Sequence, residues 1–277
     1  MKRIDQIERR LRSLNALGEV VAAMKSLAAH HLREARAAVE PTRTYREGVE
    51  RLLPANVTAE PEPGRPHGLV AIGAELGLCG AYNVRLVNEA VKRRAELGRG
   101  PTLCVGTRAA RLLARREVKV RRIYPAPTGV RGITDLLLRL AEDVLAAYGN
   151  EGLASFEIVS SRFRGIGLDV PTSVRLLPMR RSQVVAAPCA RYTSPPRFRD
   201  AVVRELLYVV LYDLFIDALA AEHAARLLAT QSAGTWIDEG RERLRRQLAA
   251  ARREASTQEI IEIAAGVRGR NRSAAKG

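Results

Sequence analysis

The final stretch of this chain, everything after Pro196, contains no proline, and its pattern predicts one nearly uninterrupted helix over residues 197–265. At 1.5 Å per residue such a helix would be about 100 Å long. A compact chain of 277 residues has a radius of gyration of about 19 Å and spans only about 50 Å. The helix therefore either breaks, with Gly234 or Gly240 as the candidate positions, or projects with an apolar stripe that something else must cover.

A second long helix is predicted at the other end of the chain, over residues 1–53. Only Pro41 interrupts it, and we expect a capping or kinking role there. Two such helices most simply pair antiparallel as a coiled coil, although an ordinary helical bundle would give a similar pattern. Apolar residues recur at steps of three and four: Ile4, Ile7, Leu11, Leu14, Leu17, Val21, Met24, Ala28, Ala35 and Ala38 in the first helix, and Val203, Leu207, Val210, Leu214, Leu244, Leu248, Ala251 and Ala255 in the second.

The middle of the chain is different in kind. Residues 54–67 are rich in proline and polar residues and predict a linker, whereas residues 179–196 predict a loop. Between them, strands and helices alternate at the spacing of parallel crossover units, which predicts a small Rossmann-like α/β domain over residues 68–178. The expected strands are 68–73, 102–106, 118–123, 154–161 and 170–177, and the expected helices are 81–97, 107–116 and 133–148.

Composition limits the partners and the compartment. Lysine and arginine total 46 against 30 acids, a formal charge of +16 that is typical of a chain with an acidic partner, while aromatic residues, at 4%, are too few for a base-stacking platform. Three cysteines imply no disulfide framework, and the N-terminus begins with a charged helix rather than a signal peptide. The longest apolar run, 206–221, is interrupted by Asp213 and Asp217, so we expect a soluble cytoplasmic chain without a membrane span.

The segment 73–80 is rich in glycine, follows a predicted strand and opens a predicted helix, as a phosphate-binding loop would. Its spacing is not the dinucleotide fingerprint, but Arg108 after the next strand could meet a 2′-phosphate, so an NADP-dependent enzyme stays open as an alternative. A tight structural turn is the simpler interpretation, with Gly77, Cys79 and Gly80 as its turn residues.

The side chains that could do chemistry do not favour catalysis. Cys79 at a helix N-terminus could be a nucleophile, but it would need a base, and the histidines lie in the linker or on the long helices. His30 and His31 are adjacent, so they point about 100° apart on a helix and are interpreted as helix-surface residues rather than joint metal ligands. We therefore expect no catalytic residue, no cofactor and no metal.

Basic residues gather on both predicted long helices. A solvated helix face would explain them, and a coiled-coil protein that binds nucleic acid is the main alternative, with an affinity that falls steeply with salt. Because like charges on a projecting helix repel, an acidic counter-surface is the natural inference. The clusters are Arg9, Arg10, Arg12, Lys25, Arg33 and Arg36 near one terminus and Arg241, Arg243, Arg245, Arg246, Arg252 and Arg253 near the other.

Three separated segments combine into one pattern. They are residues 4–29, in which an alanine-rich turn surrounds Met24 and Lys25; residues 77–83 (Gly-Leu-Cys-Gly-Ala-Tyr-Asn); and residues 222–226 (Glu-His-Ala-Ala-Arg) with 251–263 (Ala-Arg-Arg-Glu-Ala-Ser-Thr-Gln-Glu-Ile-Ile-Glu-Ile). In order, spacing and chain length this pattern resembles the gamma subunit family of rotary F-type ATP synthase. The resemblance covers essentially residues 1–266.

The resemblance implies a non-catalytic central-stalk rotor subunit. Residues 1–53 and 197–266 would form an antiparallel shaft inside the hexamer of alternating alpha and beta subunits, and residues 68–178 would be the foot, near the epsilon subunit and the membrane ring of c subunits. Ion-driven rotation of the ring would be coupled to ATP synthesis or hydrolysis, on the cytoplasmic face of the cell membrane and with no nucleic acid partner. The matching positions expected to make coupling contacts are Met24, Lys25, Arg252, Thr257, Gln258 and Glu259.

The chain also departs from the family's pattern, which indicates a divergent paralogue. His30 and His31 stand where the family usually has lysines, and Ser256 stands where it has an apolar residue. The family commonly ends soon after the glycine that matches Gly266, whereas here a basic tail, residues 267–277, continues and is expected to be disordered.

Overall fold

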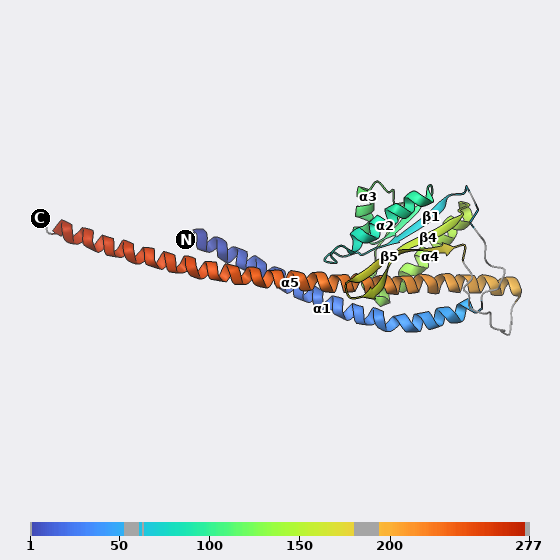
Figure 1. Cartoon of the computed structure of the whole chain (residues 1–277), viewed down its shortest axis with the longest axis horizontal. Helices are drawn as coiled ribbons and strands as arrows, with labels where there is room; N and C mark the ends of the chain where they lie inside the picture. The colour runs from blue at the N-terminus through green and yellow to red at the C-terminus, as the bar shows by residue number, and fades with distance from the viewer. Residues whose placement is uncertain (1, 53–60, 63, 180–193, 275–277) are drawn as a thin grey trace. The chain divides into compact units, whose positions relative to one another are not determined.

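The structure of the chain, a computed structural model, describes all residues except 1, 53–60, 63, 180–193 and 275–277 (Figure 1). The chain divides into two compact units, one formed by Met1–Met24 with Thr230–Gly277 and the other by Lys25–Ala229. Two long helices, α1 (Lys2–Glu50) and α5 (Pro195–Ala274), contribute segments to both units. The larger unit, Lys25–Ala229, also contains the sheet.

The sheet of the larger unit has five strands in the order β3–β2–β1–β4–β5. Its first four strands run parallel, and each successive pair along the chain is joined by a crossover that contains a helix. Strands β1 and β2 are continuous apolar runs because helices cover both faces of a parallel sheet. The parallel strands are β1 (His67–Ile72), β2 (Thr102–Val105), β3 (Arg122–Tyr124) and β4 (Ser155–Gly165).

Strand β5 (Leu168–Leu177) is the exception, because it pairs antiparallel with β4. Only Ile166 and Gly167 connect the two strands, and so short a connection can join only antiparallel neighbours. Gly167 has a φ of +86°, a left-handed conformation that glycine adopts without strain. The sequence-based expectation of parallel crossover units is therefore wrong at the last strand.

Helices cover both faces of the sheet (Figure 1). Leu69, Ala71 and Cys104 face α2 and α3, whereas Val70 and Ile72 face α4 and the middle of α5, as the two-residue period of a strand requires. The sheet is thus buried on both sides. Because Ile72, the last residue of β1, packs in the same cluster as the middle of α5, the carboxyl end of β1 lies near that helix. The shorter helices are α2 (Tyr82–Leu97), α3 (Thr107–Arg115) and α4 (Ile133–Asn150), the last preceded by the 3₁₀ turn η1 (Val130–Gly132).

Within the larger unit, α1 and α5 run antiparallel. The Tyr45 hydroxyl donates to Glu205 at 2.7 Å, whereas the ring of His31, a few turns earlier on α1, lies 5.0 Å from the ring of His223, later on α5. Residue numbers therefore fall along α5 as they rise along α1. Leu32 and other apolar residues of this part of α1 belong to the same buried cluster as the middle of α5 and the sheet.

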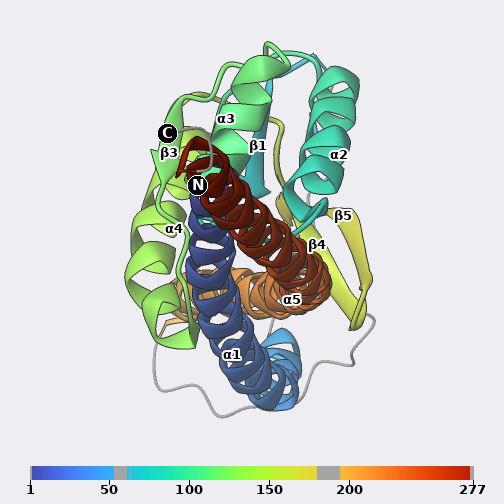
Figure 2. The ribbon, with the colours of Figure 1, turned by 90° about the vertical axis from the view of Figure 1, so that its left-hand side faces the viewer.

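The smaller unit is a second antiparallel pairing of the same two helices. Ile7 packs with Leu248 and Ala251 in a buried cluster. Further along, a Cβ atom added to Gly240 would lie 3.1 Å from a methyl group of Leu14, so the helices approach closely where α5 carries a glycine. Figures 1 and 2 show the start of α1 and the end of α5 at the same end of this unit.

The predicted fold class, a long antiparallel helix pair from both termini with a central Rossmann-like α/β domain, is confirmed. Helix α5 does not break at Gly234 or Gly240. A glycine inside a helix costs about 1 kcal/mol relative to alanine, which is too little to end a helix that packs along its length. The alternative of a broken helix, folded back on itself, is thereby excluded.

The predicted helices are corrected at three positions. Pro41 lies inside α1, so it neither interrupts nor caps the helix, while the kinking role stays a prediction. The next residue, Thr42, donates from its hydroxyl to the carbonyl of Ala38 at 2.7 Å. Of the predicted seam positions, Leu17 and Ala255 are exposed, because a three–four spacing drifts around a helix and does not specify which positions meet the partner.

The basic tail also differs from its expectation. Helix α5 continues to Ala274, so most of the segment 267–277, predicted to be disordered, is helical. Adding residues to an existing helix avoids the cost of nucleation, and arginine and alanine are good helix formers.

The six-segment division made from the sequence stays a prediction. The two compact units divide α1 after Met24 and α5 before Thr230, positions inside the helices where sequence composition does not change. Linker residues 54–60 and 63, loop residues 180–193 with Cys189, and the last three residues of the tail lie outside the described part of the chain.

Candidate functional site

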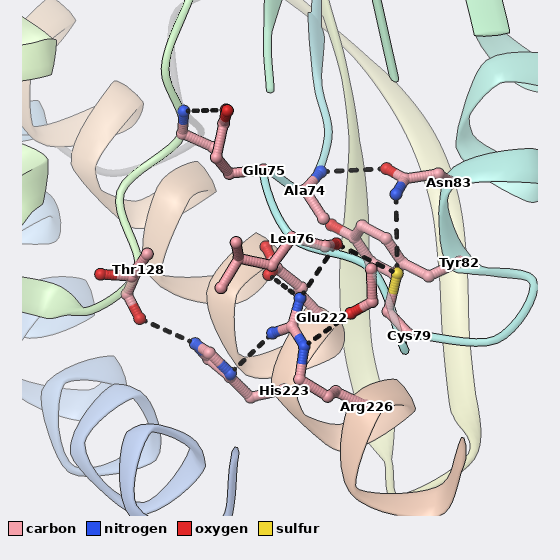
Figure 3. A network of polar contacts seen from close by, with 12 residues as sticks. Ala74, Glu75, Leu76, Cys79, Tyr82, Asn83, Thr128, Glu222, His223 and Arg226 are labelled. Carbon is pink, nitrogen blue, oxygen red and sulfur yellow. Dashed lines mark hydrogen bonds and ion pairs between the residues drawn. The ribbon is translucent and has the colours of Figure 1, made fainter. Parts of the chain in front are cut away.

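The turn that follows β1 is tied to α5 by Arg226, whose side chain is buried (Figure 3). Its guanidinium donates to the carbonyl oxygens of Gly77 at 3.1 Å and Leu76 at 3.3 Å. It also forms an ion pair with Glu222, one helical turn earlier, with 2.7 Å between nitrogen and oxygen. We call Leu76, Gly77, Glu222, His223 and Arg226 the turn–helix network.

The charge state of the network follows from its burial. Burial raises the pKa of Glu222, although the guanidinium of Arg226 opposes that shift. Burial, with Arg226 and His31 nearby, lowers the pKa of His223 to about 3, so its imidazole is neutral at physiological pH. Its Nε2 donates to the carbonyl of Thr128 at 3.1 Å, which leaves Nδ1 as the acceptor for Arg226 at 3.1 Å.

We expect the folded state to lose stability between pH 6.5 and about pH 3 because of His223. The unfolded chain takes up a proton there and the buried imidazole does not, so each pH unit below 6.5 should cost about 1.4 kcal/mol. Glu222 offsets part of this cost, because a carboxyl with a raised pKa stabilises the folded state as pH falls. Hydrogen exchange of the turn amides at pH 7 and pH 5 measures this loss of stability. The variant His223→Gln should lose less stability over the same range. An equal loss in both proteins would show that His223 is not its source.

Hydrogen bonds among Ala74, Cys79 and Asn83 hold the interior of the same turn. The amide of Asn83 donates to the Cys79 sulfur at 3.5 Å, while its oxygen accepts from the Ala74 backbone at 3.0 Å (Figure 3). Burial raises the pKa of the Cys79 thiol, which is therefore protonated at neutral pH and unsuited to nucleophilic attack. Gly80 takes a φ of +55° in the same turn.

The turn does not form a phosphate-binding loop. A phosphate site needs backbone N–H groups that point outward, whereas the carbonyls of Leu76 and Gly77 point at Arg226. The carboxylate of Glu75 already accepts hydrogen bonds from the backbone N–H groups of Thr107 and Ala126, at 3.0 Å each. The first N–H of α3 is thus occupied by a side chain. Although Arg108 on α3 is exposed, the phosphate-binding loop that an NADP-dependent enzyme needs is missing from this turn.

The predicted coupling residues near the end of α5 are all exposed, and three of the four make a hydrogen bond or ion pair within the chain. Arg252 pairs across the helices with Glu8 at 2.7 Å, in an ion pair of exposed side chains. The Thr257 hydroxyl donates to a carbonyl one turn back, and Gln258 donates to Glu262 at 2.9 Å. Glu259 lies on the same turn, so four of the six predicted residues fall within about two turns of α5, although consecutive ones point about 100° apart.

Met24 and Lys25 form a separate patch. Met24 is half-buried and Lys25 is exposed, both well along α1. Because Arg252 is level with Glu8, about 24 Å of helix separates that position from Met24. The structure therefore brings together the four residues on α5 but not these two.

The end of α5 carries an apolar surface without a partner in the described part of the chain. The last ion pair between the helices joins Arg3 to Glu254 at 3.3 Å, and every described side chain from residue 255 to 264 is exposed. Ile260, Ile261 and Ile263 are 56–66% exposed. Large exposed apolar residues clustered on one short segment are typical of a surface that another protein covers.

A groove of about 1030 Å³ lies between the helices of the smaller unit. It combines three arginines, Arg9, Arg10 and Arg243, with the ring of Trp236, which is 59% exposed. This combination favours an acidic partner that also offers apolar contact. The sequence pointed to the arginines but not to the groove, because only the antiparallel register places Arg9 and Arg10 level with Arg243.

Sequence reasoning did not identify the turn–helix network. Glu222, His223 and Arg226 belong to one recognised segment and Gly77 to another, but nothing in either segment showed that they touch. The spacing of Glu222 and Arg226, four residues apart, was the available signal for an ion pair on one helix face. His31 was also misjudged: it is half-buried against His223, not on the helix surface.

Comparisons with known proteins agree on one family. A family model described as ATP synthase matches residues 3–269. The ATP synthase gamma chain of Moorella thermoacetica is 30% identical over 284 residues, which cover 96% of this chain and 98% of that one. The ATP synthase gamma chain of Heliobacterium modesticaldum is 28% identical over 283 residues, covering 94% and 96%.

Solved structures share the fold. A chain of the Euglena gracilis mitochondrial ATP synthase, in a structure of OSCP, F1 and the c-ring, superposes with a TM-score of 0.65 at 16% identity and covers 95% of this chain and 92% of its own. A chain of the Tetrahymena thermophila mitochondrial ATP synthase central stalk and c-ring superposes with a TM-score of 0.56 at 20% identity and covers 77% of this chain and 99% of its own.

A search of the described helices for a membrane span finds no segment with the length and apolar character that one requires.

Proposed function

The chain belongs to the ATP synthase gamma family, and from that premise we propose that it is the rotor shaft that couples ion-driven rotation of a membrane ring to ATP synthesis or hydrolysis. As a gamma subunit it is a non-catalytic part of the central stalk.

The exposed end of α5 is the observation that carries the proposal. Ile260, Ile261 and Ile263 leave more than half of each side chain in water, although burying one isoleucine is worth about 1.5–3 kcal/mol. A cluster of exposed apolar residues of this kind is typical of a surface that a partner covers. An apolar sleeve formed by alpha and beta subunits around the end of the shaft would do so.

The charge of the shaft supports the same partners. The groove with Arg9, Arg10 and Arg243 offers cations to acidic segments of the beta subunits. Exposed ion contacts are individually weak, which suits a shaft that must pass from one beta subunit to the next without being held by any of them.

The remaining partners are proposed by analogy with the family. The α/β part of the chain would bind the epsilon subunit and the membrane ring of c subunits, and the chain would then lie peripherally at the cytoplasmic face of the cell membrane. The nucleic-acid-binding coiled coil considered from the sequence is not needed, because acidic subunits account for the same arginines.

Reversal of charge at Arg252 tests the coupling role. In a complex of this chain with its cognate alpha and beta subunits, we expect Arg252→Glu to lower the rate of ATP hydrolysis by about three- to thirtyfold, because an exposed charge contact is worth about 0.3–1 kcal/mol and reversal of the charge doubles that cost. Assembly should be largely intact, since the residue is exposed and its removal exposes no core.

Glu8 supplies the control. Glu8→Gln removes the intrachain partner of Arg252 but keeps the arginine, so hydrolysis should stay close to that of the unaltered complex. Equal rates for Arg252→Glu and the unaltered complex would remove Arg252 from the coupling surface. Equal losses in both variants would assign the residue to the helix pairing instead.

A further inference from the structure

One turn of α1 brings two imidazoles and a carboxylate together. The Nδ1 atom of His31 lies 3.0 Å from one carboxylate oxygen of Glu34, and the Nε2 atom of His30 lies 3.6 Å from the other. One ligand atom from each of the three residues lies within 4.8 Å of the other two. The adjacent histidines do point apart on the helix, but Glu34 stands three and four residues later, between them.

The loop before α4 holds the His31 ring in place. His31 packs against His223 with 5.0 Å between ring centroids, and its side chain is only 18% exposed. On another side, a Cβ atom added to Gly129 would lie 3.1 Å from Nδ1 and from Cε1 of His31. Glycine at that position therefore lets the backbone approach the imidazole, whose orientation is set by packing before any ligand arrives.

The donor set selects a class of ion. Two imidazoles and one carboxylate suit Zn²⁺ and related divalent transition metals, whereas Mg²⁺ and Ca²⁺ prefer oxygen ligands alone. Ligand atoms on a tetrahedral zinc ion are about 3.4 Å apart, at bond lengths of about 2.0–2.1 Å. The separations of 3.0 Å and 3.6 Å, which involve different oxygens of Glu34, lie on either side of this value. His30, whose side chain is 57% exposed, can rotate to bring its imidazole nitrogen to the same ion.

We propose that His30, His31 and Glu34 form a binding site for a divalent transition-metal ion of the zinc type. Three protein ligands leave one coordination position open to water or to a group from another subunit. Because the side chain of His31 extends from α1 to the loop at Gly129, a bound ion would stiffen this turn of α1 where it contacts that loop. Arg131 on η1 lies close enough to Glu34 to act on it electrostatically, and its positive charge opposes the ion.

Titration of the full-length chain, in complex with its alpha and beta subunits, with Zn²⁺ and with Co²⁺ as a spectroscopic substitute tests the site. We expect one saturable site whose Co²⁺ absorption bands indicate tetrahedral or five-coordinate geometry. Because His30 is exposed, His30→Ala should fold normally and bind at least about a hundredfold more weakly, more than the 10–100-fold that outer-shell partners contribute. Glu34→Gln should weaken binding in the same way.

Two variants at residues that are not ligands test whether the ion binds at this site. His67→Gln removes a histidine on β1 and should leave the affinity unchanged, whereas Arg131→Gln should tighten binding by about two- to fivefold, the range of an exposed charge interaction. The proposal is overturned if the unaltered complex shows no saturable site, or if His30→Ala and Glu34→Gln bind as tightly as the unaltered chain. Loss of the site in His67→Gln would likewise place the ion elsewhere.

Discussion

Replacement of Arg226 by leucine is expected to lower the free energy of local opening at the turn–helix network by about 3–5 kcal/mol. The change leaves Glu222 buried without its partner at 2.7 Å, and it leaves the carbonyls of Leu76 and Gly77 without their donor. A buried charge that loses its partner costs far more than an exposed one. Hydrogen exchange of the amides of residues 74–83, measured in the assembled complex, reports the opening free energy directly.

Three further variants separate the ion pair from general packing. Arg43→Leu breaks an exposed pair with Glu40 on α1 and should change the opening free energy by less than about 0.5 kcal/mol. The double variant Arg226→Leu with Glu222→Leu should recover part of the loss, because no charge stays buried alone. Arg226→Lys should be intermediate, since an ammonium has only three donors and cannot serve all four acceptors of the guanidinium. A loss below about 1 kcal/mol for Arg226→Leu would contradict the account.

Replacement of Ile260, Ile261 and Ile263 by serine is expected to weaken association with the alpha and beta subunits by about two to four orders of magnitude. Each side chain is more than half exposed in the chain alone, so covering it in a complex is worth about 1–2 kcal/mol, or about 3–6 kcal/mol for the three together. Folding of the chain should be largely unaffected, because these residues belong to none of the buried clusters of the described chain. Co-purification from cells that express only the alpha, beta and variant chains measures the loss.

A matched control uses apolar residues of equal exposure elsewhere. Ile123, Leu138 and Ile166 lie in the α/β unit and are 50–53% exposed. Their simultaneous replacement by serine should leave co-purification with alpha and beta subunits unchanged, because this part of the chain is proposed to face the epsilon subunit and the ring. Equal losses in the two triple variants would mean that any reduction of surface apolarity disrupts assembly, and the specific role of the α5 end would be lost.

The long helices could be predicted because their signals are local. Absence of proline after residue 196 and apolar steps of three and four along the helix are properties of the helix alone. Exposure of Ile260, Ile261 and Ile263 could not be predicted in this way. It depends on where α1 begins relative to α5, and only the pairing of Arg3 with Glu254 shows where the partner helix ends.

The buried ion pairs of Asp213 and Asp217 could not be predicted from the sequence either. In the sequence, Asp213 and Asp217 appear only as interruptions of an apolar run. In the structure they are buried and paired, Asp213 with Arg46 of α1 at 2.8 Å and Asp217 with Arg162 of β4 at 2.7 Å. Their partners are more than fifty positions away in the chain, and no spacing rule within a helix reaches that far. The turn–helix network was missed for the same reason.

Native mass spectrometry of this chain, co-expressed with its cognate alpha and beta subunits, tests the central claim most directly. A rotor shaft that occupies one central cavity must appear once for every three alpha and three beta subunits, and the Ile260, Ile261 and Ile263 variant should deplete that species. A chain that remains outside the hexamer, or that joins it in equal numbers with alpha and beta, would contradict the account.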